Sequence, residues 1–125
     1  MNTTSRVWQV LLILAAATVV FGATLAPNFA MPKPDFSLCV ICGIYGTSNG
    51  MQNVILFMPL GAALANTRLG LGKVALLGTL VSVGVEVAQF WIPGRSPGIG
   101  DLLTNGTGTL LGALALRFAA THLWV

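Results

Sequence analysis

Long apolar runs, separated by short polar or proline- and glycine-containing segments, dominate the pattern of this chain. Such runs are predicted to be helices when they reach the ~20 residues that a bilayer requires. The predicted spans are 7–26, 51–66, 73–92 and 102–123. The pattern therefore predicts an all-α membrane protein, a bundle of four transmembrane helices in a single domain over residues 1–125.

The second of these runs has the most irregular pattern. The segment 46–50 before it, Gly-Thr-Ser-Asn-Gly, is typical of a turn, and Ser48 or Asn49 is suited to cap the helix that follows. The apolar part is short for a bilayer, so we expect it to lie upright, to thin the bilayer locally, or to be extended by its loop. Pro59 lies inside it and predicts a kink, because its ring removes one backbone donor.

The first run has an alternative interpretation as a cleaved signal peptide. The small residues Ala23 and Ala26 are weakly suited to a cleavage site. The apolar run is nevertheless longer than the ~7–15 residues usual for the core of such a peptide. We therefore predict that the first helix is retained.

Composition supports the membrane interpretation. The chain is 55% hydrophobic and only 7% charged, with a mean hydropathy of +0.86. A soluble domain carries ~25% charged residues, so a water-soluble surface cannot be built from this sequence. The net charge of +3 comes from basic residues scattered singly, which argues against nucleic acid as a partner.

The distribution of charge predicts the orientation. With four spans, both termini and the 67–73 loop share one side of the membrane, and that side holds four basic residues and no acidic one. These are Arg6, Arg68, Lys73 and Arg117. On the other side, Lys33 and Arg95 are balanced by Asp35 and Asp101. The positive-inside rule then places both termini in the cytoplasm.

The polar residues of the apolar runs suggest a functional site. Glu86 is the only interior charge of the third span, and a charge at that depth costs on the order of 2.5–3.5 kcal/mol. The spacing places the polar side chains on facing helix surfaces near the outer ends of the helices. We predict one outward-facing polar pocket made by Asn53, Glu86, Gln89, Arg95, Asp101 and Asn105. Glu86 and Asp101 are the candidates for acid–base chemistry.

Each of these features also has a structural interpretation. Glu86 and Arg95 could form an ion pair that only locks the bundle, and Asn53 and Asn105 could be bonded across helices. Gly108 and Gly112 follow the small-xxx-small pattern, which mainly favours close helix packing.

The pair Cys39 and Cys42 is predicted to lie on the outer side, where a disulfide is permitted. A disulfide or a simple pair of thiols is the favoured interpretation. A structural zinc site needs four ligands, and the lone histidine, His122, is predicted at the opposite side. No metal site is predicted, and no sequence motif for a cofactor is present.

Several motifs resemble those of the VanZ-like family of small bacterial membrane proteins. They are Cys39-Val-Ile-Cys42-Gly43, Asn53-Val-Ile-Leu-Phe57-Met-Pro59-Leu-Gly61, Glu86-Val-Ala-Gln89, Arg95, Asp101-Leu-Leu-Thr-Asn105, Gly108 and Leu111-Gly112. The cysteine pair belongs to only part of the family. The resemblance implies a multi-pass protein of the bacterial cytoplasmic membrane, in a family named after a protein that gives low-level resistance to the glycopeptide teicoplanin. The resemblance therefore implies where the protein is located and the biological context of its family, but it does not imply a particular reaction.

These observations lead to one main functional hypothesis and two alternatives. The main hypothesis is a cell-envelope protein that binds, and in one version modifies, a polar or lipid-linked group at the outer leaflet. Its partner would be a membrane lipid or a lipid-linked envelope precursor, with Arg95 holding a phosphate or carboxylate. The alternatives are a structural or assembly module and a subunit of a small transporter. Self-association to a homo-oligomer is left open by the sequence.

The predicted orientation can be tested with reporter fusions. Alkaline phosphatase fused after Val125 is expected to be inactive, and the same reporter placed in the 35–50 loop is expected to be active, because the enzyme matures only outside the cytoplasm. Activity from the C-terminal fusion would contradict the model with four spans and a cytoplasmic N-terminus.

Overall fold

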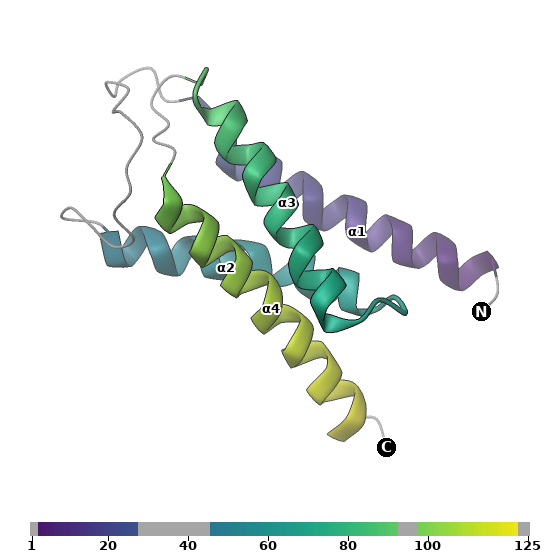
Figure 1. The fold of residues 1–125 in the computed structure, drawn as a ribbon. Helices are drawn as coiled ribbons and strands as arrows, with labels where there is room; N and C mark the ends of the chain where they lie inside the picture. The colour runs from purple at the N-terminus through teal and green to yellow at the C-terminus, as the bar shows by residue number, and fades with distance from the viewer. Residues whose placement is uncertain (1–2, 28–45, 93–97, 123–125) are drawn as a thin grey trace.

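The computed structural model describes residues 3–27, 46–92 and 98–122, and these ranges form four α-helices (Figure 1). The helices are α1 (Thr3–Thr24), α2 (Gly46–Ala65), α3 (Leu71–Gln89) and α4 (Ile99–His122). The predicted all-helical fold is therefore confirmed for the described part of the chain.

Each predicted span boundary lies one to five residues from the helix boundary in the structure, and the start of α2 and the end of α3 are two examples. The segment 46–50 is not a separate turn, because α2 already begins at Gly46 and the predicted turn forms its first residues. At the other boundary, α3 ends at Gln89 rather than at residue 92. The amides of the next three residues bond to carbonyls three positions back, as that of Phe90 does to Val87, and this tighter winding ends the α-helix before Pro93.

The closest contact in the bundle is between α2 and α4, and it depends on glycines of α4. A Cβ atom on Gly108 would lie 2.2 Å from the carbonyl oxygen of Val54, and one on Gly112 would lie 2.0 Å from that of Met58. Any side chain at either position would force the two helices apart. The packing role predicted for Gly108 and Gly112 agrees with this geometry.

Glycines of α2 and α3 also lie against α4, and both contact it at Thr109. A Cβ atom on Gly61 of α2 would lie 1.8 Å from the Thr109 carbonyl oxygen, and one on Gly78 of α3 would lie 2.4 Å from the Thr109 side chain. Thr109 is fully buried, and its hydroxyl donates to the carbonyl of Asn105 one turn earlier (2.9 Å). The midsection of α4 therefore lies directly against two other helices.

The surface of the bundle is as apolar as its interior. Phe57, Val20 and Val74 are fully buried, but large apolar side chains also point outward along α1 and α3. Exposed examples are Trp8, Leu11, Leu14, Leu76, Leu80 and Val87. An apolar exterior of this extent is suited to contact with lipid rather than with water.

Two of the described helices are long and apolar enough to cross a membrane by length and composition. They are Thr4–Thr24 within α1 and the whole of α3, Leu71–Gln89. The apolar part of α2, Gly50–Ala65, is shorter. This is consistent with a membrane protein and makes two of the four predicted spans candidates by length and composition.

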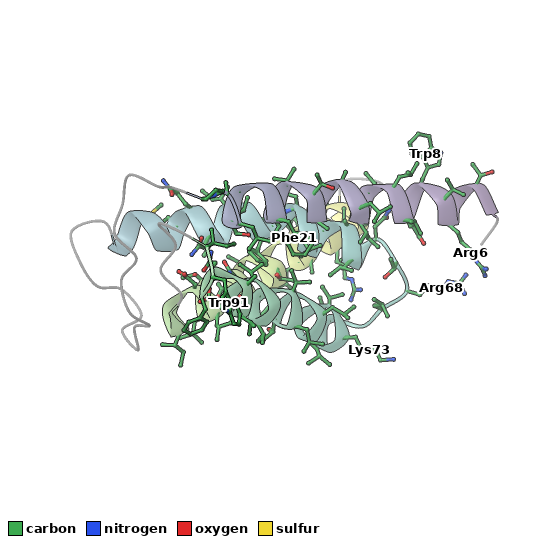
Figure 2. The ribbon with its side chains drawn as sticks, turned by 90° about the horizontal axis from the view of Figure 1, so that it is seen from above. Arg6, Trp8, Phe21, Arg68, Lys73 and Trp91 are labelled. Carbon is green, nitrogen blue, oxygen red and sulfur yellow. The ribbon has the colours of Figure 1, made fainter. Side chains whose placement is uncertain are left out.

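The basic side chains of the described residues gather at one end of the bundle. Arg6, at the start of α1, lies at the same end as Arg68 and Lys73, which flank the beginning of α3 (Figure 2). Arg117 of α4 reaches that end as well, because its guanidinium donates to the carbonyl oxygen of Leu69. The grouping of these four residues that was expected from the sequence is thus present in the structure.

The glycine contact predicts a contrast between two glycine-to-alanine substitutions. Gly112→Ala is expected to lower the free energy of unfolding by about 1–3 kcal/mol, because the added methyl group overpacks the α2–α4 contact. Gly84→Ala is the control, since a Cβ there meets no atom within 4 Å. It is expected to be neutral or to stabilise α3 by up to ~1 kcal/mol. Thermal unfolding in detergent would measure both, and equal effects would contradict the close contact.

Candidate functional site

Polar side chains from α2, α3 and α4 meet at the end of the bundle opposite to the basic residues. Asn53, in the second turn of α2, donates from Nδ2 to Oδ1 of Asp101, in the first turn of α4 (2.8 Å). The same amide is 3.5 Å from the hydroxyl oxygen of Thr104. The glycine-mediated approach of α2 and α4 is what brings these side chains within reach of each other.

Glu86 occupies the centre of this polar cluster. It is only 5% exposed, and its Oε2 accepts a 2.6 Å hydrogen bond from the backbone N–H of Gly98. Because Gly98 immediately precedes α4, the carboxyl group lies at a helix N-terminus, where negative charge is stabilised. Asp101 follows Gly98 by three residues, so its carboxyl group belongs to the same helix start that holds Glu86.

Gln89 and Asn105 link the cluster to further elements. Nε2 of Gln89 donates to the carbonyl oxygen of Thr24 at the end of α1 (2.9 Å), and Nδ2 of Asn105 donates to the hydroxyl of Ser82 on α3 (2.9 Å). All four helices therefore contribute to one hydrogen-bonded region.

Three acceptor oxygens in this region receive no hydrogen bond from a described residue. They are Oε1 of Glu86, Oε1 of Gln89 and Oδ1 of Asn105. The side chains are 5%, 6% and 2% exposed, so bulk water does not solvate these atoms either. The carboxyl group of Asp101 could donate to Glu86 only if Asp101 itself carried a proton.

Five of the six predicted site residues are brought together by this arrangement. They are Asn53, Glu86, Gln89, Asp101 and Asn105. Arg95 lies outside the described residues, and so do Cys39 and Cys42, so their predicted roles stay predictions. In the parts of the chain that the structure describes, no three His, Cys, Asp or Glu side chains are arranged to hold a metal ion.

Two partners in the cluster were not predicted from the sequence. The backbone N–H of Gly98 binds Glu86, for which we had expected Arg95 or Asp101 as partner, and the carbonyl of Thr24 binds Gln89. Both are backbone groups, which residue types do not reveal. The sequence did offer one signal for the bond to Gly98. The fourth helix was predicted to start nearby, and the first backbone amides of a helix have no partner within the helix.

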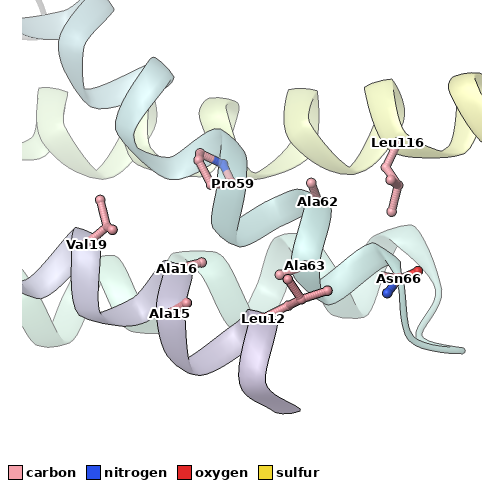
Figure 3. Close-up of a pocket in the computed structure, with 9 residues that line it drawn as sticks. All are labelled: Leu12, Ala15, Ala16, Val19, Pro59, Ala62, Ala63, Asn66 and Leu116. Atoms are coloured by element: carbon pink, nitrogen blue, oxygen red, sulfur yellow. The ribbon is translucent and has the colours of Figure 1, made fainter. Parts of the chain in front are cut away.

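A separate apolar groove of about 510 Å³ lies between α1 and α2, with Leu116 of α4 at its edge (Figure 3). Leu12 and Val19 of α1 and Pro59 and Ala63 of α2 are among its lining residues. Its lining is almost entirely aliphatic, so it is suited to an acyl chain and offers little for polar chemistry.

The sequence was compared with known families and proteins. The sequence model of the VanZ/LLP1 family matches residues 2–120, nearly the whole chain. The chain belongs to the VanZ/LLP1 family. The family resemblance inferred from the motifs is therefore confirmed. No curated protein and no solved structure matches the chain.

The family match covers every described residue of the polar cluster, because it extends from the start of α1 to residue 120, near the end of α4. The cluster is therefore part of the VanZ/LLP1 region itself rather than of an added segment.

The hydrogen bond between Asn53 and Asp101 can be tested with a double-mutant cycle. Asn53→Leu is expected to lower stability by about 1.5–3 kcal/mol, because it leaves the carboxyl of Asp101 without its donor. In the double variant Asn53→Leu/Asp101→Leu, the loss should be smaller than the sum of the single losses. Thermal unfolding of the purified variants measures each value. Strictly additive losses would contradict a direct interaction between the two side chains.

Proposed function

We propose that this VanZ/LLP1 protein spans the bacterial cytoplasmic membrane four times, with both termini in the cytoplasm. The polar cluster then lies toward the outer leaflet, and its function is to bind a polar or lipid-linked group of the cell envelope there. The apolar surface and the basic end opposite the cluster support this orientation. The partner is a membrane lipid or a lipid-linked envelope precursor.

The observation that carries this proposal is the set of buried acceptor oxygens that receive no hydrogen bond from a described residue. Leaving such an atom unpaired costs about 1–3 kcal/mol, so three of them in one region of a small bundle call for an explanation. A bound group that carries hydroxyl or N–H donors would pair them. Arg95 is expected to add a contact to a phosphate or carboxylate of the same ligand.

If the site also modifies its ligand, the carboxyl pair of Glu86 and Asp101 is the device for it. Two neighbouring carboxyl groups in a buried site favour holding one proton between them, because both cannot ionise without repulsion. One carboxyl could then donate a proton and the other accept one. If the ligand is bound but not modified, only the hydrogen bonds between the ligand and the polar cluster are required.

A structural function is the second candidate, and the hydrogen bonds themselves favour it. At least one hydrogen bond to another helix, or to the residue that precedes another helix, is made by each of Asn53, Glu86, Gln89 and Asn105. Bonds of this kind between membrane helices contribute ~0.6 kcal/mol on average, so the cluster could serve to hold the bundle together. In a transporter subunit, the same residues would line the path of a transported substrate through the bundle instead of forming a binding site.

Glu86→Gln separates binding from structure, because it removes the charge and changes the shape little. If the cluster binds a ligand, the variant should insert and unfold like the wild type but lose a lipid that co-purifies with the wild-type protein. Native mass spectrometry of the detergent-extracted protein, together with thermal unfolding, measures both properties.

The control for this experiment is Thr107→Val, on the exposed side of α4, where the hydroxyl bonds only to its own helix. It should retain both the lipid and the stability of the wild type. A Glu86→Gln variant that is less stable but keeps the same lipid would refute the binding function and leave the structural one.

A further inference from the structure

We propose that the basic end of the bundle holds a second binding site, for the phosphate of an anionic phospholipid, between Arg6 and Arg68. A cavity of about 390 Å³ lies there, lined by Arg6, Gln9, Val10, Ile13, Thr67 and Arg68. It lies at the opposite end of the molecule from the polar cluster, so it is a separate site, and its place in the cytoplasmic leaflet rests on the orientation proposed above.

Two guanidinium groups from segments far apart in the sequence converge on this cavity. Arg6 belongs to the first turns of α1, and Arg68 belongs to the link between α2 and α3. Both side chains are exposed. The acidic residues of the described ranges, Glu86 and Asp101, lie in the polar cluster, so no described carboxylate neutralises the arginines. The guanidinium fork matches the geometry of a phosphate group.

The cavity is amphipathic, which points to a lipid rather than to a free anion. Val10 and Ile13 line it one and two turns from Arg6, so an apolar surface adjoins the charged mouth. Arginines at the cytoplasmic end of a membrane helix would lie at the level of the anionic headgroups of that leaflet.

The apolar groove provides a place for an acyl chain of the same lipid. Gln9, which lines the basic cavity, donates from Nε2 to the carbonyl oxygen of Asn66 (2.9 Å), and Asn66 lines the groove. The basic cavity and the apolar groove therefore lie on either side of this hydrogen bond. Between Leu12 and Val19 the groove extends for ~10 Å along α1, which lies within one leaflet of a ~30 Å hydrocarbon core.

The test uses the full chain in detergent after removal of bound lipid. Titration with phosphatidylglycerol, followed by native mass spectrometry, gives the affinity for the first bound lipid. Arg6→Gln and Arg68→Gln are each expected to weaken it about fivefold, and the double variant further, as the loss of one exposed charge contact predicts. Both side chains are exposed, so the variants should unfold at the wild-type temperature.

Lys73→Gln is the matched control, because it removes one positive charge at the same end without touching the cavity. It should change the affinity for phosphatidylglycerol little. Phosphatidylcholine, whose headgroup has no net charge, should bind more weakly and show no dependence on the two arginines.

Three results would overturn the proposal. An equal loss of affinity in Lys73→Gln would show that only the overall charge of this end matters. Phosphatidylcholine binding with the affinity of phosphatidylglycerol would exclude recognition of the anionic headgroup. Inorganic phosphate that displaces the lipid completely, with the same dependence on Arg6 and Arg68, would identify a site for the free anion instead of a lipid.

Discussion

The direct backbone contact between α2 and α4 is the interaction on which the rest of this structure depends. Gly108, Gly112 and Gly61 allow each helix to lie against the carbonyl groups of the other. In an apolar solvent, helices gain little from burying apolar surface against each other, so close van der Waals packing has to hold them together. The same contact sets the distance at which Asn53 reaches Asp101. A looser crossing would separate the polar groups that form the candidate site.

The position of the polar cluster follows from a second constraint, the cost of leaving polar groups unpaired away from water. Glu86 is tolerated because the start of α4 offers the amide of Gly98, and this is one of the few unbonded donors that a helical bundle provides. The cluster therefore lies where a helix begins rather than in the middle of the bundle. The described residues supply no donor to one oxygen each of Glu86, Gln89 and Asn105, so this part of the cluster has more acceptors than donors that reach them.

The sequence was sufficient to predict the four helices, the packing glycines and most members of the cluster, because each depends on residue type and spacing. Apolar length predicts the helices, and the spacing of Glu86 and Gln89 puts them on one face. The start of α2 and the end of α3 were predicted wrongly, because backbone hydrogen bonds at the helix ends decide such boundaries and residue types only weakly indicate these bonds. The partners of Glu86 and Gln89 could not be predicted for the same reason, since both are backbone groups brought close by tertiary packing.

The two ends of the molecule differ in the kind of chemistry they can support. At the polar end, the described side chains offer oxygen acceptors and two carboxyl groups, so a ligand must bring donors or a positive charge. At the basic end, Arg6 and Arg68 offer donors and positive charge, so a ligand must bring an anion. A single phosphate-bearing headgroup cannot satisfy the described groups at both ends equally well. The polarity of the bundle therefore distinguishes the proposed site for an envelope group from the proposed site for an anionic phospholipid.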